Sequence, residues 1–247
     1  MITSLFSMLL LAVDTSGKQG SIALAECGTP ANCAVVEVVP LAGGAFSAQL
    51  VPEIAVLLEK HGYNKRDLGA LIVASGPGSF TGLRVGLAAV KALAEVLHTP
   101  IVAISVLEAV ACSSAGRERV LGLLDAGRGD AYVGDYEVDL QAGMKIGARV
   151  RMHSERLLSW DEFMAEARLP EAPSEPGLPV VVTPDVALAE KLRAAGIEVE
   201  VIAYPNSGVI ARLGWEHLQR GDTVRPEALE ANYLRRSDAE IFSKPAR

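Results

Sequence analysis

The sequence predicts an α/β fold with two related halves. Short aliphatic runs alternate with helical patterns, as expected where helices pack on a mixed sheet. Half of the 247 residues are hydrophobic, enough for one large or two modest cores. An apolar strand, an aspartate, small residues and a returning strand begin at residue 9, and the same order begins again at residue 119. We expect a first lobe over residues 1–107 and a second over 108–247.

The first half reads as three strands followed by two helix–strand units. Residues 9–13, 21–25 and 33–39 are the expected strands, with a polar turn at 14–17. Ser47 is expected to cap a helix that ends at Gly62. A buried strand at 71–74, a glycine-rich turn at 75–82, a helix at 83–97 and a strand at 100–104 follow. Ser79 or Thr81 can supply the cap of this second helix.

The second half repeats the pattern less clearly. Strands are expected at 119–124, 131–136 and near 148–152, followed by a helix capped by Ser159. Residues 169–179 are rich in proline and predict a linker. Strand, helix and strand are expected at 180–182, 186–195 and 197–202, then an amphipathic helix at 209–220 that could pack back on the first lobe. The tail after Arg236 is polar and expected to fray.

Composition excludes several classes of function. A net charge of −7 argues against unaided binding to nucleic acid, which needs a basic surface. Three cysteines without C-x-x-C spacing predict neither a disulfide framework nor a zinc site, and fit a reducing cytoplasm. The four histidines lack metal-ligand spacing. No apolar run approaches the roughly 20 residues of a membrane span, and the apolar start reads as a strand rather than a signal peptide.

The helix over residues 83–97 is apolar almost all round. Its charges, at Arg84, Lys91 and Glu95, share one narrow stripe. One apolar side can face the helix's own sheet, through Leu83, Leu87, Val90, Ala94 and Leu97. A second apolar side of the helix remains, and it predicts that a further element or a partner protein packs against it. This side comprises Val85, Gly86, Ala89, Ala92, Leu93 and Val96, and its glycine permits close backbone approach.

The glycine-rich turn admits two interpretations. Backbone N–H groups at a helix N-terminus attract anions, but the turn matches neither a Walker A loop nor the dinucleotide-binding fingerprint. It is otherwise a tight turn that joins strand to helix. Asp14 is either a base or metal–nucleotide ligand, or a turn residue that bonds its own backbone. Asp125 and Asp130 read as turn residues, with a role in a site as the lesser alternative. A vestigial nucleotide or phosphate loop would comprise Asp14, Ser16, Gly76, Gly78, Ser79, Thr81 and Gly82.

The run SGPGSFTGLRVG at residues 75–86 resembles the TsaB (YeaZ) family, which serves N6-threonylcarbamoyladenosine synthesis in bacterial tRNA. Other motifs agree along most of the chain: LAVDTS at 11–16, Ser47-x-x-Leu50-x-Pro52-x-Ile54, ISVLE at 104–108, LDAGR at 124–128 and YLR at 233–235. The resemblance implies an actin/Hsp70/sugar-kinase-like (ASKHA) fold of two related lobes, each a mixed β-sheet with packed helices.

The resemblance also implies the partners. A TsaB protein pairs with the catalytic TsaD paralogue through its first two helices, with the TsaE ATPase as a third member. The paralogue holds its metal on two histidines of an N-H-L-E-x-H motif, whereas the matching positions here are Val106 and Val110, and valine cannot coordinate a cation. The family's usual histidine before the first helix is Phe46 here. ATP and a metal ion are therefore expected in the partner subunits, with no cofactor required by this chain.

The leading hypothesis is a cytoplasmic, non-catalytic scaffold subunit, not an enzyme by itself. Its complex would transfer threonylcarbamoyl from threonylcarbamoyl-AMP to N6 of the adenosine 3′ of the anticodon, in tRNAs that read ANN codons. The chain would meet tRNA only within the complex and could form a homodimer when alone. A stable interface needs about 1,200 Å² or more in total; the expected contact residues are Leu50, Ile54, Leu57, Val85, Gly86, Ala89, Ala92, Leu93 and Val96. The alternative is an acid-kinase-like nucleotide phosphotransferase that uses Asp14 and the 76–82 loop.

Overall fold

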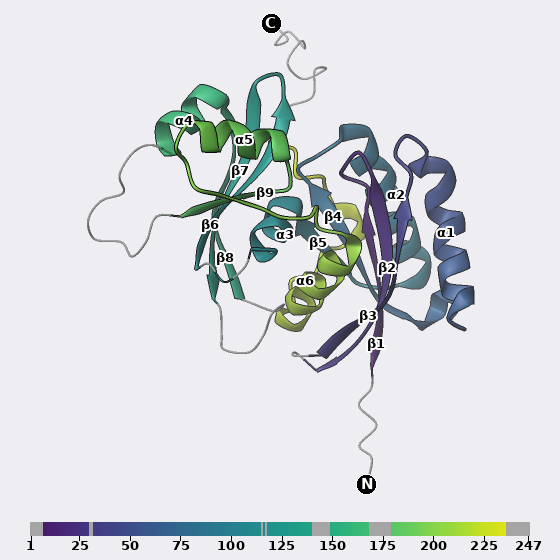
Figure 1. Cartoon of the computed structure of the whole chain (residues 1–247). Coiled ribbons are helices and arrows are strands. Elements are labelled where there is room, and N and C mark those ends of the chain that lie inside the picture. The colour runs from purple at the N-terminus through teal and green to yellow at the C-terminus, as the bar shows by residue number, and fades with distance from the viewer. Residues whose placement is uncertain are drawn as a thin grey trace, which may run out of the picture.

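The computed structural model describes residues 7–29, 32–114, 116, 118–139, 149–167 and 179–235. They form two five-stranded sheets of identical topology. The first sheet has the strand order β3-β2-β1-β4-β5 and the second β8-β7-β6-β9-β10. In each, three antiparallel strands are followed by two parallel ones. The repeated pattern of the sequence is therefore a repeated lobe, as the ASKHA fold requires (Figure 1).

Each sheet follows the hydrophobic pattern of its sequence. Leu10, Leu11, Ala12 and Val13 of β1 are fully buried, because β1 is the central strand and is covered on both faces. The strands of the first sheet are β1 (Met8–Asp14), β2 (Gly20–Thr29), β3 (Asn32–Leu41), β4 (Leu68–Gly76) and β5 (Ile101–Ser105). Those of the second are β6 (Arg119–Gly127), β7 (Asp130–Asp139), β8 (Arg149–Ser159), β9 (Val180–Thr183) and β10 (Val199–Val201).

Helices pack on the faces of both sheets, so that each lobe consists of layers. Helices α1 (Phe46–Lys60) and α2 (Phe80–Leu97) pack on one face of the first sheet, and α6 (Ser207–Arg220) packs on the other face. Helix α3 (Val106–Cys112) lies between the two sheets, and α4 (Trp160–Ala167) and α5 (Val186–Ala194) cover the far face of the second. Figure 1 shows α1 and α2 at the outer side of the first lobe, away from the second. The chain also forms two short 3₁₀ turns, η1 (Lys65–Asp67) and η2 (Pro226–Ala228).

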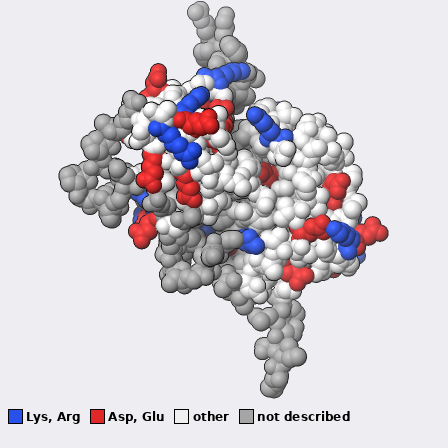
Figure 2. All heavy atoms as spheres, viewed as in Figure 1, with Lys and Arg blue, Asp and Glu red and all other residues white. Residues whose placement is uncertain are grey.

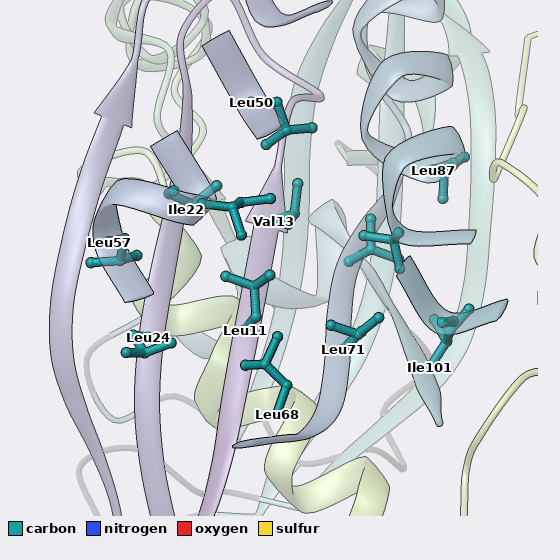
Figure 3. Close-up of a cluster of buried hydrophobic side chains, with 14 of the residues drawn as sticks. Leu11, Val13, Ile22, Leu24, Leu50, Leu57, Leu68, Leu71, Leu87 and Ile101 are labelled. Carbon is teal, nitrogen blue, oxygen red and sulfur yellow. The ribbon is translucent and has the colours of Figure 1, made fainter. Parts of the chain in front are cut away.

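The largest core of the first lobe lies under α1 and α2. Alternate residues of β1 point into it, so that Leu11 and Val13 meet Leu50 and Leu57 of α1 (Figure 3). On α2, the side chains expected to face the sheet are buried at Leu83, Leu87, Val90 and Ala94. Leu97 is only half-buried, because the helix ends there. The two helices are thus held to the sheet by one aliphatic face each.

The C-terminal segment ties the lobes together. The Val224 N–H donates to Ile101 O of β5 (2.8 Å), and the Asn232 N–H donates to Ser75 O of β4 (2.7 Å). Three residues further on, Arg235 pairs with Asp130 of β7 across 2.6 Å. The segment therefore runs from the edge of the first sheet to the first turn of the second.

Three sequence-based expectations about the elements are wrong. Ser47 does not cap α1, which begins at Phe46 and has no side-chain cap. Helix α3 was not foreseen as an element, since its seven residues are too short to show a helical period. Cys27 and Cys33 form a disulfide, because the β2–β3 hairpin places them directly opposite each other with Cα atoms 4.0 Å apart. Spacing along the chain gave no sign of that pairing.

Other expectations agree with the structure or concern residues that it does not describe. Ser79 caps α2 by accepting from the Gly82 N–H, and Ser159 bonds the Glu162 N–H at the start of α4. The strand expected near 148–152 is longer, since β8 runs to Ser159. The linker at 169–179 lies almost entirely outside the described residues, as does the tail after Arg236. No helix in the described part of the chain is long and apolar enough to span a membrane.

Candidate functional site

A cleft of about 1130 Å³ lies between the two lobes. The first lobe contributes the β1–β2 turn, the start of α1 and the glycine-rich turn before α2. The second lobe contributes the β6 end, the start of α5 and the segment before α6. Of the predicted loop residues, the cleft lining includes Asp14, Ser16, Gly78, Ser79, Thr81 and Gly82, and Asp125 lies on the opposite wall. Gly76, the remaining residue of the predicted loop, does not line the cleft.

Asp14 is buried at the end of β1 and holds the turn that follows it. Its Oδ1 accepts from the Ser16 N–H at 2.8 Å and from the Ser16 hydroxyl at 2.5 Å. Burial raises the pKa of Asp14 above its ordinary value, and the two bonds from Ser16 only partly oppose this. The geometry is that of a turn residue bonded to its own backbone, which was one of the two interpretations left open.

The glycine-rich turn packs on the chain's own backbone. A Cβ at Gly78 would lie 2.4 Å from Ser16 O, and one at Gly82 would lie 2.0 Å from Thr15 O. The Ser79 N–H donates to Ser16 O at 2.7 Å, so an amide that could meet a phosphate is already bonded. The glycines therefore serve the contact between two turns of one chain.

The interpretation of Gly86 as room for a partner helix is wrong. Gly86 is buried, and a Cβ there would lie 2.3 Å from Thr15 Oγ1. The Thr15 hydroxyl in turn donates to Gly82 O at 2.8 Å. Both glycines of α2 thus let the helix approach its own β1 strand.

The second lobe supplies cleft residues that the sequence did not reveal. Tyr204 lies against the first lobe, with its hydroxyl 3.1 Å from Ser16 Oγ. Burial and the nearby Asp14 raise the pKa of Tyr204, so its hydroxyl stays protonated at neutral pH. Asn206 caps α6 and Asp185 caps α5. The helix-cap pattern could have indicated these last two, but no motif pointed to Tyr204.

The cleft is poorly matched to a nucleotide with its phosphates. Asp14, Asp125 and Asp185 line it, and Lys18 is the only lysine or arginine among the described lining residues. Phe46 stands where the family's histidine is expected and is packed against Gly20, so this corner is apolar. A phosphate chain would meet three aspartates against one lysine, and a turn whose Ser79 amide is already bonded.

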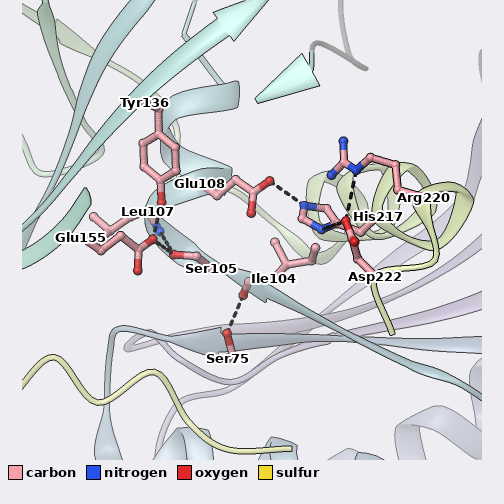
Figure 4. Close-up of polar contacts among 10 residues, drawn as sticks. All are labelled: Ser75, Ile104, Ser105, Leu107, Glu108, Tyr136, Glu155, His217, Arg220 and Asp222. Carbon is pink, nitrogen blue, oxygen red and sulfur yellow. Dashed lines mark hydrogen bonds and ion pairs between the residues drawn. The ribbon is translucent and has the colours of Figure 1, made fainter. Parts of the chain in front are cut away.

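The positions that match the paralogue's metal motif are in the core. Val106 and Val110 are fully buried on α3, each in a different hydrophobic cluster. The polar residues nearby bond one another: Glu155 of β8 accepts from Ser105 and Tyr136 (Figure 4). It also accepts from Asn232 Nδ2 at 2.5 Å. Among the described residues, no group of three or more His, Cys, Asp or Glu could hold a metal ion.

A second polar cluster, in which two carboxylates contact one histidine, joins α3 to α6. Glu108 Oε1 lies 2.8 Å from His217 Nε2, and Asp222 Oδ2 lies 3.3 Å from His217 Nδ1 (Figure 4). Arg220 pairs with the same aspartate at 3.1 Å. Both polar groups therefore hold elements of this chain together.

The other candidate surface is the outer side of α1 and α2, which we call the α1–α2 face. The residues Val56 and Val96 are 58% and 69% exposed, although both are large and apolar. The right-hand edge of the molecule, over α1, is mostly white in Figure 2, with charged residues gathered toward its lower end. The face comprises Ala48, Val51, Pro52, Ala55, Val56, Ala88, Ala92 and Val96, all exposed and all uncharged.

The structure changes which residues belong to this face. Leu50, Ile54 and Leu57 are buried under α1 in the core of their own lobe, so they present no surface to a partner. Their neighbours on the opposite side of the helix, from Ala48 to Val56, take their place. On α2, Val85, Ala89 and Leu93 are half-buried against the core, whereas Ala92 and Val96 are exposed as expected.

The family model and the similar proteins found by comparison point to the same family. The family model described as "TsaD: tRNA N6-adenosine threonylcarbamoyltransferase" matches residues 38–241. The tRNA threonylcarbamoyladenosine biosynthesis protein TsaB of Bacillus subtilis is 34% identical over 131 residues, which are 53% of this chain and 56% of that protein. TsaB of Escherichia coli is 33% identical over 135 residues, with the same coverage. The chain thus spans about half the length of the curated relatives that it matches.

A solved structure supports the fold over nearly the whole chain. YeaZ from Pseudomonas aeruginosa superposes with a TM-score of 0.70 at 26% identity, covering 92% of this chain and 100% of that one. The match includes both lobes, since residues outside it amount to less than a tenth of the sequence.

Proposed function

Because this chain belongs to the TsaB (YeaZ) family within the TsaD superfamily, we propose that it is a non-catalytic scaffold subunit in the synthesis of threonylcarbamoyladenosine in tRNA. It pairs with a TsaD-like catalytic paralogue through the α1–α2 face, and a TsaE-like ATPase joins the pair. The complex transfers threonylcarbamoyl to the adenosine 3′ of the anticodon in tRNAs that read ANN codons. The complex works in the cytoplasm.

The α1–α2 face is the observation that carries this proposal. Its members are exposed alanine, valine and proline residues on two packed helices, and the charged residues Lys91 and Glu95 lie beside them on α2. Exposed apolar patches mark interaction sites, and the centres of protein interfaces are depleted in charge. The alanines of the face suit a partner helix, since small residues let helices approach closely.

The interior supports a scaffold rather than an enzyme. The carboxylates near α3 are bonded within the chain, and the metal-motif positions are buried valines. The cleft offers one lysine and three aspartates to a nucleotide. We assign ATP and the metal ion to the partner subunits, as the family resemblance implies.

Reconstitution tests the proposal directly. The paralogue, the ATPase, tRNA and a source of threonylcarbamoyl-AMP are combined with and without this chain, and the modified nucleoside is measured. Modification should require the chain, and the chain alone should modify nothing. Equal modification without the chain, or modification by the chain alone, would contradict the scaffold role.

Calorimetric titration with ATP–Mg²⁺ separates this proposal from the phosphotransferase alternative. A kinase-like cleft binds nucleotide at micromolar to millimolar levels, whereas the isolated chain should release no binding heat in that range. Saturable binding that is lost in Asp14→Ala would favour the alternative.

A further inference from the structure

The α1–α2 face continues at one edge into a group of aromatic rings and a guanidinium. Phe80 is the first residue of α2, and Arg84 lies one turn further on, with its Cζ 3.8 Å from the centre of the Phe80 ring. Tyr233 of the C-terminal segment lies against the same phenyl ring, with centroids 5.1 Å apart. Phe80 and Tyr233 are 37% and 42% exposed, and Arg84 is exposed as well. We call these three residues the Arg84 group.

The three residues of the Arg84 group contact one another, but the positive charge of Arg84 has no carboxylate partner among the described residues. The guanidinium stacks on Phe80, which fixes the direction of its five N–H donors. Arg84 makes no ion pair with any residue that the structure describes. Most other arginines with described partners here pair with carboxylates, such as Arg156 with Glu166 at 2.8 Å. An arginine held in place by a ring and lacking an anion is prepared to bind one at low entropic cost.

The position of the group links it to the proposed interface. Arg84, Ala88 and Ala92 follow one another at intervals of four residues, so the guanidinium borders the uncharged part of α2. Tyr233 belongs to the segment that is anchored to β4 by the Asn232 N–H. A partner that covers Ala88 and Ala92 and extends past Arg84 would therefore reach the C-terminal segment.

We propose that the Arg84 group is an anchor of the partner interface and that it binds a carboxylate of the partner protein, an inference that rests on the proposed pairing. The interface then extends beyond the two helices onto Tyr233. Aromatic residues and arginine are the types that dominate binding energy at interfaces. The planar guanidinium fits a carboxylate through two parallel hydrogen bonds.

A protein carboxylate fits the surroundings better than an RNA phosphate. RNA binding requires several cations along the backbone, whereas the chain has a net charge of −7, and the α2 stripe that begins at Arg84 holds only one further cation, Lys91, together with an anion, Glu95. An aromatic and apolar border around one cation is instead typical of an interface between proteins, where the border excludes water from the charged pair.

Affinity for the catalytic paralogue is measured for the wild-type chain and four variants whose thermal unfolding matches it. Arg84→Glu should weaken pairing at least thirtyfold. Arg84→Lys should weaken it about tenfold, since lysine keeps the charge but loses stacking and the forked donors. Phe80→Leu should act similarly, because it keeps the apolar contact but frees the guanidinium. Arg151→Glu, the matched charge reversal at an exposed site on β8, should change the affinity less than twofold.

The outcomes separate the anchor from the pairing itself. If Arg84→Glu pairs within twofold of the wild type while Ala92→Glu abolishes pairing, the anchor is wrong and the scaffold role stands. If the wild-type chain does not pair, the proposed function fails. Fluorescence anisotropy with labelled tRNA tests the other anion: a loss of tRNA binding in Arg84→Glu with pairing unchanged would assign the group to phosphate and overturn the inference.

Discussion

Asp14 occupies a position typical of a catalytic carboxylate, and its hydrogen bonds hold a turn of its own chain together. Its position after a buried strand predicts a place at the edge of the first sheet, and the structure puts it in the inter-lobe cleft. The sequence could not decide its role, because both roles require an aspartate there. The bonds from Ser16 show that the carboxyl holds the turn, and its burial raises its pKa.

Asp14→Asn should stabilise the chain at neutral pH. The folded state raises the pKa of Asp14 above its ordinary value of 3.8, so the folded state holds the proton more tightly than the unfolded state. Stability contributed by this group is therefore complete below pH 3.8 and is lost as the pH rises. Asparagine keeps an acceptor for Ser16 and removes the charge. Urea unfolding at pH 5 and 7.5 should show that the substitution raises the free energy of unfolding, and raises it more at the higher pH. A lower free energy of unfolding for Asp14→Asn at pH 7.5 would contradict this account.

Gly86→Ala tests whether α2 packs on its own chain. The new Cβ would lie 2.3 Å from Thr15 Oγ1, and moving that hydroxyl would break its bond to Gly82 O. Overpacking of this kind costs about 1–3 kcal/mol. Gly28→Ala is the matched control, because its Cβ would have no heavy atom within 4 Å. Chemical denaturation of both variants measures the difference, and equal stability would contradict the packing described above.

At the scale of elements, periodicity predicted most of the structure. The helical spacing of aliphatic residues placed α1, α2 and α6, and short aliphatic runs placed the strands. Periodicity also predicted that α2 has a second apolar side. It could not tell which side of α1 faces the sheet, and it therefore assigned Leu50 and Leu57 to a partner although they are core residues. Burial depends on the neighbouring elements, which a single helix pattern does not contain.

The contact between α3 and α6 should make stability depend on pH. Glu216 of α6 is partly buried near Glu108, and burial raises its pKa from 4.5 to about 7, opposed by Arg220 and His217. The folded state thus binds a proton that the unfolded state has lost between pH 4.5 and 7, so stability falls as the pH rises through this window. Glu216→Gln should flatten that part of the profile. Unfolding measured from pH 4.5 to 8 checks it, and parallel profiles for the two proteins would refute the assignment.

At the scale of the whole molecule, the internal repeat was visible in sequence but the joining of the lobes was not. The repeated strand–aspartate pattern predicted two lobes of one topology, which the sheets have. The C-terminal segment joins them through Asn232 and Arg235, whose partners lie 157 and 105 residues away along the chain. No local pattern specifies contacts over such distances. The Cys27–Cys33 disulfide is a local contact with a sequence separation of 6, but it depends on the register of the β2–β3 hairpin, which cysteine spacing alone does not give.

The pair Asp130–Arg235 should contribute to the stability of the assembled lobes. Its atoms are 2.6 Å apart with side chains 31% and 22% exposed, and Arg235 also donates to Gly127 O at 3.0 Å. A double-mutant cycle with Asp130→Ala and Arg235→Ala should give a coupling energy of about 1 kcal/mol, reduced at high salt. A coupling indistinguishable from zero would mean that the segment is held by its other contacts.

The most direct test of the account is pairing with the catalytic paralogue after a charge is placed in the α1–α2 face. Ala92→Glu adds a carboxylate at an exposed helical position, and Ala194→Glu adds the same group on α5 of the other lobe. Val85 and Leu93 suit this test less well, because both pack against the core. Size-exclusion chromatography of the mixed subunits should show that Ala194→Glu co-elutes with the paralogue and that Ala92→Glu, equally well folded, does not. Co-elution of Ala92→Glu with unchanged affinity would contradict the proposed interface.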